Sequence, residues 1–367
     1  MTTAYSGDGI TFPDASVQAT APRVGMVNRI INGDMRIDQR NAGAAYTINN
    51  DGDYGIDRWK LRTYGGSGRY SIQQSGNVPE GFTTSAKLTV TTTDTSGTNG
   101  YSIAQHIEGY NMADLVMGTA SAKPYTISFW VKSSVVGTYC VSSRTISAVA
   151  SCVKTYTIVL ANTWEYKTLV FPANTAFTTN TVNEVSLYVD FNLGAQTSKT
   201  TATVDAWQAG NFVCTSAQTD WISNAGATFH LTGVQLEKGS TATDFEYLDY
   251  GRQLQMCQRY FEKSYDIGTA VGTVTGIGSI GTVAYGASVS RPFLGIQFQT
   301  AKRTSATVTS YTPNTADTSG KIGGPSGADL SAVIQNAGTQ SFKIYQSQVT
   351  STSNGDYYIH WTSSAEL

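Results

Sequence analysis

Apolar and polar residues alternate along much of the chain, and this period of two predicts β-strands with one buried face. Residues 125–132 (YTISFWVK) and residues 86–91 (AKLTVT) are clear examples. Because such runs follow one another with few helical patterns between them, they predict an all-β chain built as an antiparallel sandwich or jelly roll. Similar runs cover residues 156–160, 165–171, 185–191, 228–236, 342–349 and 357–361, and Gly, Asn, Asp, Ser and Thr dominate the intervening segments 94–100, 174–183, 224–226 and 353–356.

One segment departs from this alternation and predicts a short α-helix over residues 249–263. Asp249 is a suitable N-cap, and Lys263 would lie in the last turn, where its charge favours the helix dipole. We expect this helix to mark the boundary between two β-domains. Steps of four, three and four residues place its apolar side chains on one helical face: Tyr250, Leu254, Cys257 and Phe261.

These patterns predict four parts. Residues 26–248 form the jelly-roll domain, residues 249–266 the linker helix and residues 267–367 a C-terminal β-sandwich domain. Residues 1–25 contain two prolines and too few apolar residues for a core, so we expect an extended arm that is ordered by contacts with partners. The arm lacks the basic and apolar regions of a signal peptide, and no signal peptide is expected.

Charge narrows the class of partner. The chain of 367 residues has 24 basic and 26 acidic residues, a net charge of −2, and only 14% charged residues, against roughly 25% in ordinary soluble domains. A nearly neutral chain does not offer the basic surface that binds nucleic acid. Hydrophobic residues at 40% and aromatic residues at 11% indicate a folded chain rather than a disordered one.

Cysteines and acidic residues offer two hypotheses. Cys140 and Cys152 flank a segment that could form a hairpin loop, so they could pair, although a reducing cytosol favours two free thiols. Asp51, Asp53 and Asp57 lie in and just after the densest acidic cluster, and hard cations prefer such oxygen ligands. A structural calcium is therefore one interpretation of this cluster, and a plain Asn/Asp/Gly turn is the favoured one.

Aromatic residues are the candidates for sugar binding, because sugar ring faces stack on Trp and Tyr. Trp59 and Trp130 lie within predicted strands among apolar neighbours, and we expect both in the core. Four other aromatic residues lie in looser, more polar sequence and are the candidate glycan platforms, with partly buried scaffold as the alternative for each: Tyr64, Tyr70, Trp207 and Trp221.

Several stretches resemble phage tail-fibre and appendage proteins that carry a jelly-roll domain similar to carbohydrate-binding modules. Asp244 stands where that family often has Pro, and Ala15 where it often has Gly; we expect neither to touch a site. The stretches are residues 9–21 (GITFPDASVQATA), 28–40 (NRIINGDMRIDQR), 54–59 (YGIDRW), 231–246 (LTGVQLEKGSTATDFE), 257–261 (CQRYF) and 358–367 (YIHWTSSAEL).

The resemblance implies a virion structural protein, made in the host cytoplasm and usually homotrimeric, that contacts other virion proteins through its N-terminal arm. From it we expect a tail fibre or similar appendage that binds host-surface glycan as a receptor-binding protein, without catalysis and without a cofactor. One alternative is a capsid decoration, head fibre or tail component that binds no receptor. Another is a polysaccharide depolymerase, for which Asp190 and Asp205 are the candidate carboxylates, although the chain offers little acid–base chemistry.

Overall fold

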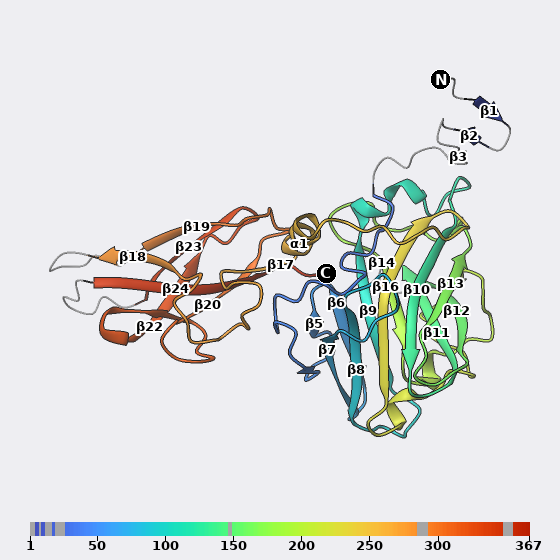
Figure 1. The fold of residues 1–367 in the computed structure, drawn as a ribbon, viewed down its shortest axis with the longest axis horizontal. Coiled ribbons are helices and arrows are strands. Elements are labelled where there is room, and N and C mark those ends of the chain that lie inside the picture. The colour runs from blue at the N-terminus through green and yellow to red at the C-terminus, as the bar shows by residue number, and fades with distance from the viewer. Residues whose placement is uncertain are drawn as a thin grey trace.

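The computed structural model describes residues 4–6, 9–11, 17–18, 26–145, 149–284, 293–347 and 355–367. Two antiparallel sheets face each other as a sandwich, and a third sheet lies beside them, joined through a short helix (Figure 1). The predicted all-β class is confirmed. Within the described residues, no helix is long and apolar enough to cross a membrane.

One layer of the sandwich is a six-stranded sheet. Its central strands pair across large sequence distances, because β16 lies between β10 and β8. The sheet is therefore complete only when β16, the last strand of the sandwich along the chain, inserts between β10 and β8. In spatial order the strands are β13 (Glu165–Phe171), β10 (Tyr125–Ser133), β16 (Thr228–Lys238), β8 (Ser85–Thr92), β7 (Arg69–Ser75) and β4 (Tyr46–Thr47).

The second layer has seven strands. Predicted alternation again sets which side chains face inward, and Trp59, Phe129 and Phe191 meet between the layers. The ring centroids of Phe129 and Phe191 lie 5.0 Å apart, and those of Trp59 and Phe191 lie 6.2 Å apart. Burying each such side chain contributes roughly 1.5–3 kcal/mol. In spatial order the strands are β15 (Gln208–Ala209), β12 (Ala150–Ile158), β11 (Gly137–Thr145), β14 (Val185–Asn192), β9 (Gly100–Glu108), β6 (Trp59–Tyr64) and β5 (Tyr54–Ile56).

The C-terminal strands form one curled sheet, which differs from the expected second sandwich. β24 is long enough to pair with several strands along its length, so the sheet curls around Phe298, Phe342 and Trp361. The main path is β17 (Phe261–Lys263), β24 (Gly355–Ser364), β21 (Lys321–Gly323), β22 (Asp329–Gln335), β23 (Ser341–Gln346) and β19 (Phe293–Gln297), and β18 (Ile280–Ala284) and β20 (Thr307–Tyr311) also pair with β24.

The predicted helix is present as α1 (Tyr250–Gln258), and it is shorter than expected. Asp249 caps it, because its Oδ1 accepts a hydrogen bond of 2.9 Å from the Arg252 backbone N–H. The expected last turn around Lys263 is wrong, since Phe261–Lys263 is strand β17, paired with β24. Strand pairing with a segment a hundred residues away overrides the local helical period.

Short 3₁₀ turns complete the described regular structure. They are η1 (Gly109–Asn111), η2 (Ala113–Leu115), η4 (Thr197–Lys199), η5 (Trp221–Ser223) and η6 (Pro325–Gly327).

Parts of the N-terminal arm are described. β1 (Ala4–Ser6), β2 (Gly9–Thr11) and β3 (Val17–Gln18) form a small antiparallel sheet that is separate from the other three, above the sandwich in Figure 1. The remaining residues of the expected arm lie outside the described residues, and its contacts with partners stay a prediction.

All four cysteines are buried and free. Cys140 and Cys152 do not pair because they face opposite sides of the seven-stranded sheet. Cys152 lies in the sandwich core, whereas Cys140 packs with Val153, Val213 and Cys214 in a smaller cluster. Of the two interpretations above, the free thiols are the correct one.

A buried charged cluster joins the sandwich to the third sheet. The Arg58 guanidinium forms an ion pair with Glu366, donates to the His106 carbonyl oxygen at 2.7 Å and lies 3.6 Å from the centroid of the Tyr260 ring. Arg40 bridges Glu366 and Asp57 with ion pairs of 3.1 and 3.0 Å. The last strand of the third sheet is therefore tied to the opening segments of the sandwich.

A second contact fixes α1 to the same junction. Glu108, at the end of β9, accepts hydrogen bonds from the Arg259 guanidinium at 2.6 Å and the Tyr260 hydroxyl at 2.5 Å. Burial alone would raise the pKa of the Glu108 carboxyl, but these donors outweigh it and hold that pKa below its usual value. Arg259 and Tyr260, which lie within the stretch CQRYF, thus fix the junction.

The junction gives a pH prediction for Asp57→Asn. Burial raises the pKa of Asp57 to about 6, so the folded protein retains a proton that the unfolded chain releases near pH 4. The stability supplied by Asp57 is therefore present below about pH 4 and lost as pH rises towards 6. In urea unfolding, the stability of the Asn variant relative to the parent should rise over this interval and level off above it. A relative stability that falls as pH rises would contradict the assignment.

Candidate functional site

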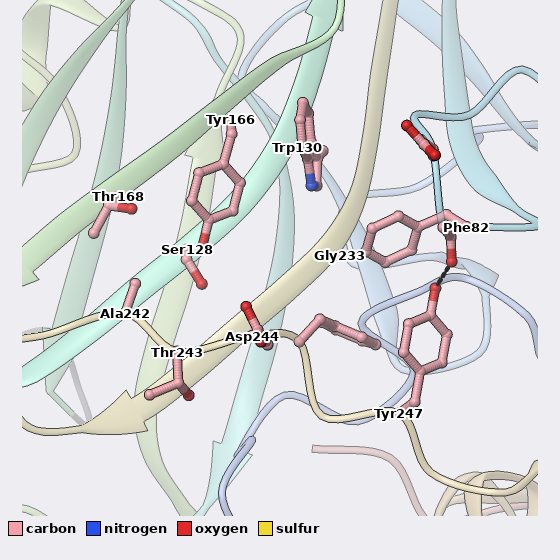
Figure 2. Close-up of a pocket in the computed structure, with 13 residues that line it drawn as sticks. Phe82, Ser128, Trp130, Tyr166, Thr168, Gly233, Ala242, Thr243, Asp244 and Tyr247 are labelled. Carbon is pink, nitrogen blue, oxygen red and sulfur yellow. Dashed lines mark hydrogen bonds between the residues drawn. The ribbon is translucent and has the colours of Figure 1, made fainter. Parts of the chain in front are cut away.

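A groove of about 800 Å³ lies on the outer face of the six-stranded sheet (Figure 2). Strands β13, β10 and β16 form its floor. Residues 80–82, from the connection between β7 and β8, form one wall, and residues 242–247, after β16, form the other. Segments from widely separated parts of the chain therefore meet here.

Trp130 and Tyr166 supply the exposed aromatic surface of the floor. They are directly opposite on β10 and β13, and their ring centroids lie 5.3 Å apart. Phe129 and Val131 point into the core, so Trp130 between them points outward by the pleat of the strand. The Tyr166 side chain is 45% exposed, and it is available for contact.

Three aromatic rings belong to the two walls, Phe82 to one and Phe245 and Tyr247 to the other. The centroids of Phe82 and Phe245 lie 5.3 Å apart, and that of Tyr247 lies 5.6 Å from Phe82 and 5.1 Å from Phe245. The Tyr247 hydroxyl donates to the carbonyl oxygen of Gly81, the bond dashed in Figure 2. The two walls are therefore linked to each other above β16.

Gly233 allows the wall to approach the floor. The pairing of β10 with β16 shifts register between Ser128 and Trp130, which marks a β-bulge. Gly233 lies at this bulge with φ +61°, and an added Cβ would meet the Phe82 ring at 2.7 Å and Trp130 at 3.2 Å. A side chain at this position would strain the backbone and displace both rings.

The second wall is a return segment held by a buried polar face of β16. Glu237 accepts hydrogen bonds of 2.8 Å from both the backbone N–H and the hydroxyl of Thr243. Gln235 accepts one of 2.8 Å from the Glu246 backbone N–H. Both Gln235 and Glu237 are fully buried, so the return segment covers them, and their polar groups are satisfied by it.

The return segment also reaches the start of the sandwich. A Glu246 carboxylate oxygen accepts a hydrogen bond of 2.7 Å from the Asn28 backbone N–H. The Asn28 side chain in turn donates to the Val234 carbonyl oxygen at 2.9 Å and accepts from the Leu236 N–H at 3.0 Å. Two of the stretches quoted above, residues 28–40 and 231–246, therefore meet and build the wall of the groove.

Polar groups lie at the rim and floor. Glu80 and Asp244 are exposed carboxylates, and Ser128, Thr168 and Thr243 add hydroxyls. Asp244 thus lines the groove, and the expectation that it touches no site is wrong. The arrangement combines flat apolar surfaces with hydrogen-bonding groups, which suits a ligand that has both.

The structure places the four predicted glycan platforms outside the groove. Tyr70 and Trp221 are fully buried in the core, with ring centroids 6.1 Å apart, so their assignment as glycan platforms is wrong. Trp207 is half-buried over a separate shallow hollow and donates to the Pro172 carbonyl oxygen at 2.9 Å. Tyr64 is 55% exposed on the other sheet. The polar sequence around Trp221 belongs to a turn that inserts this ring between the layers.

Trp130 was expected in the core and instead forms the floor of the groove. A signal for this was present, because Trp130 shares its strand parity with Thr126, Ser128 and Lys132 rather than with the apolar residues. The same parity places Tyr166 with Thr168. Position within the alternation was therefore a better guide than the apolar neighbours.

The three acidic candidates do not form one cation site. Asp51 pairs with Arg62 at 2.9 Å, and buried Asp57 pairs with Arg40 as described above. Asp53 accepts from the Tyr46 hydroxyl at 2.7 Å. Although burial alone would raise the pKa of Asp53, this bond and backbone N–H groups hold it below its usual value. Across the described part of the chain, no three His, Cys, Asp or Glu residues could hold a metal together.

The depolymerase candidates are also apart. Asp190 forms an ion pair of 2.7 Å with Arg144, and Asp205 forms one of 2.7 Å with Lys154. They line two different hollows. They therefore do not make the pair of facing carboxylates that glycoside hydrolysis requires.

No family model and no curated protein matches the chain. Among similar solved structures is the enzymatically active domain of tailspike protein 4 of bacteriophage CBA120, at 16% identity and a TM-score of 0.32. The match covers 58% of this chain, which spans only 21% of the length of that one.

Two further matches are sugar-binding domains of other proteins. The family 11 carbohydrate-binding module of a Clostridium thermocellum cellulosomal cellulase has 12% identity and a TM-score of 0.27, over 55% of this chain and 99% of that one. The N-terminal cellulose-binding domain of Cellulomonas fimi β-1,4-glucanase C has 13% identity and a TM-score of 0.26, over 55% and 99%. These are partial backbone likenesses, and the chemistry of the groove comes from its own side chains.

Gly233→Ala tests the packing of the groove. We expect about 1–2 kcal/mol of lost stability from the positive φ, and about 1–3 kcal/mol more from contact with Phe82 and Trp130. Gly226→Ala is the matched control, because Gly226 has φ +69° and nothing within 4 Å of an added Cβ. Chemical denaturation measures both variants. Equal losses would show that Phe82 and Trp130 yield freely and that the walls are not tightly packed.

Proposed function

We propose that the groove binds a carbohydrate chain without catalysing its cleavage. The observation that carries this proposal is the pair of outward-facing rings, Trp130 and Tyr166, beside the aromatic rings of the two walls. Sugar rings present apolar faces that stack on such rings, while their hydroxyls need the hydrogen-bonding groups that lie at the rim. Asp244 and Glu80 are acceptors of this kind.

The size and openness of the groove support an oligosaccharide. Its volume of about 800 Å³ lies within the range of roughly 300–1,000 Å³ that small-molecule sites have. The paired states of Asp190 and Asp205 support the non-catalytic part of the proposal.

We further propose that the protein is a phage virion component, a tail fibre or similar appendage that uses the groove to bind host-surface glycan. The support is the resemblance of residues 9–21, 231–246 and 257–261 to such proteins. In the structure, the last two of these stretches build the groove wall and the domain junction. On this proposal the arm contacts other virion proteins, and three chains form the appendage.

Trp130→Ala tests the groove. Loss of a central stacking surface should weaken binding of a neutral oligosaccharide identified on a glycan array by about tenfold or more. Isothermal titration calorimetry measures the affinity, and circular dichroism verifies the fold. Trp207→Ala is the matched control, since Trp207 is also a half-buried tryptophan of the sandwich and lines a different hollow.

Two results would overturn the binding proposal. One is the absence of any ligand on arrays of host-surface and plant-type glycans. The other is equal weakening by Trp130→Ala and Trp207→Ala, which would assign the loss to a general effect on the sandwich.

An electron-microscopy map of intact particles tests the virion proposal. We expect density for the chain on a tail or appendage, in groups of three copies, with residues 1–25 nearest the particle. Density distributed over the capsid would favour the decoration alternative. Absence of the chain from purified particles would contradict a virion role altogether.

A further inference from the structure

A second, smaller hollow lies on the outer face of the seven-stranded sheet. Strands β6, β9, β11 and β14 contribute to it, and its volume is about 30 Å³. It shares no lining residue with the groove, which is on the other sheet. Three cationic side chains converge there with one carboxylate: Arg62, Arg144, Lys199 and Asp190.

The charges of this hollow do not balance. Arg144 donates to Asp190 with Nη2 at 2.7 Å and Nε at 3.2 Å, and Arg62 pairs with Asp51 at 2.9 Å. Lys199 has no carboxylate partner within the described residues, and its contact is with the Tyr64 ring, whose centroid lies 4.5 Å from Nζ. Three cations therefore face two carboxylates, which leaves one positive charge.

The positive charges in the hollow repel one another, and this repulsion acts on the Lys199 amine. Burial lowers the pKa of Lys199, and the nearby guanidiniums of Arg144 and Arg62 lower it further. An anion beside Lys199 would offset this repulsion and stabilise the charged form of the amine. The hollow thus favours a negative ligand group over a neutral one.

Gln196 adds an unpaired donor. Its residue is 5% exposed, it lines the hollow, and its Nε2 is buried without a hydrogen-bond partner. Gly100 leaves the space for this amide, because an added Cβ there would lie 2.4 Å from the Gln196 side-chain oxygen. A buried donor without a partner is rare in folded proteins, and a ligand oxygen would satisfy it.

The dimensions select the ligand group. A volume of about 30 Å³ is two to three times the roughly 10–15 Å³ that one water molecule needs, so the hollow has room for a carboxylate but not for a sugar ring. Tyr64, at the mouth, is 55% exposed. A ring attached to the carboxylate would therefore lie outside, against Tyr64.

We propose that this hollow binds the carboxylate of an acidic sugar, with the Lys199 ammonium and the Gln196 amide as donors and Tyr64 as the contact for the sugar ring. The site is separate from the carbohydrate groove and does not depend on it. It gives Tyr64, a candidate from the sequence, a role beside a cation rather than as an isolated stacking platform.

Calorimetry on the full chain tests the proposal with two disaccharides that differ in one group, cellobiouronic acid and cellobiose. We expect the uronic acid to bind more tightly, and Lys199→Gln to weaken it by about tenfold, the order expected for a hydrogen bond to a charged group. Lys199→Arg should retain most of the affinity. Lys123→Gln is the control for loss of charge, since Lys123 is exposed ahead of β10, away from the hollow.

Four outcomes would overturn the proposal. Equal binding of the two disaccharides, or no effect of Lys199→Gln in a variant that unfolds at the parental temperature, would remove the carboxylate site. Inorganic sulfate that competes as well as the uronic acid would show a general oxyanion site without sugar recognition. Loss of uronic acid binding in Trp130→Ala would place that ligand in the groove, so failure here is distinguishable from failure of the proposed function.

Discussion

The contact between the buried polar face of β16 and its return segment is the constraint on which the rest of the structure depends. Gln235 and Glu237 point away from the core, and they would be costly to bury without partners. Residues 242–247 supply those partners. The same bonds hold Phe245 and Tyr247 over the sheet and direct the chain towards α1, so one hydrogen-bonding arrangement positions both the groove and the junction.

The junction completes this arrangement from the other side. Glu366 lies between Arg40 and Arg58, and Glu108 receives Arg259 and Tyr260, so the chain is fixed to the sandwich both where it enters the third sheet and where it leaves it. These ions are mostly buried, and each has an opposite charge within contact. Removing one member of such a cluster leaves a buried charge unpaired, which is why the cluster specifies one docking geometry. The third sheet is consequently not a freely hinged appendage.

The alternation of apolar and polar residues predicted most of the strands, and the position of a residue within that alternation predicted part of the site. β8, β10, β13, β14, β16 and β24 overlap the predicted runs closely, because one buried face needs a period of two whatever the strand pairs with. The capped start of α1 was equally local. The end of α1 did not follow from local sequence. Phe261 was predicted on the apolar face of the helix, but it lies in β17 and pairs with Ser364 of β24. The outward direction of Trp130 could be predicted from its position in the alternation. Tyr70 and Trp221 were wrongly predicted as exposed platforms, because the polar composition of a loop does not reveal that one of its rings inserts into the core.

Local sequence was sufficient for the all-β class, the helix start and the outward direction of Trp130, because each depends on neighbours within a few residues. Tertiary structure alone decided which outward residues meet. It brought Phe82 beside Trp130 across a glycine bulge, separated Asp190 from Asp205, and gathered Arg62, Arg144 and Lys199 around an unpaired amide. Register and crossover connections between distant strands decide these meetings, and such pairings leave no local period in the chain.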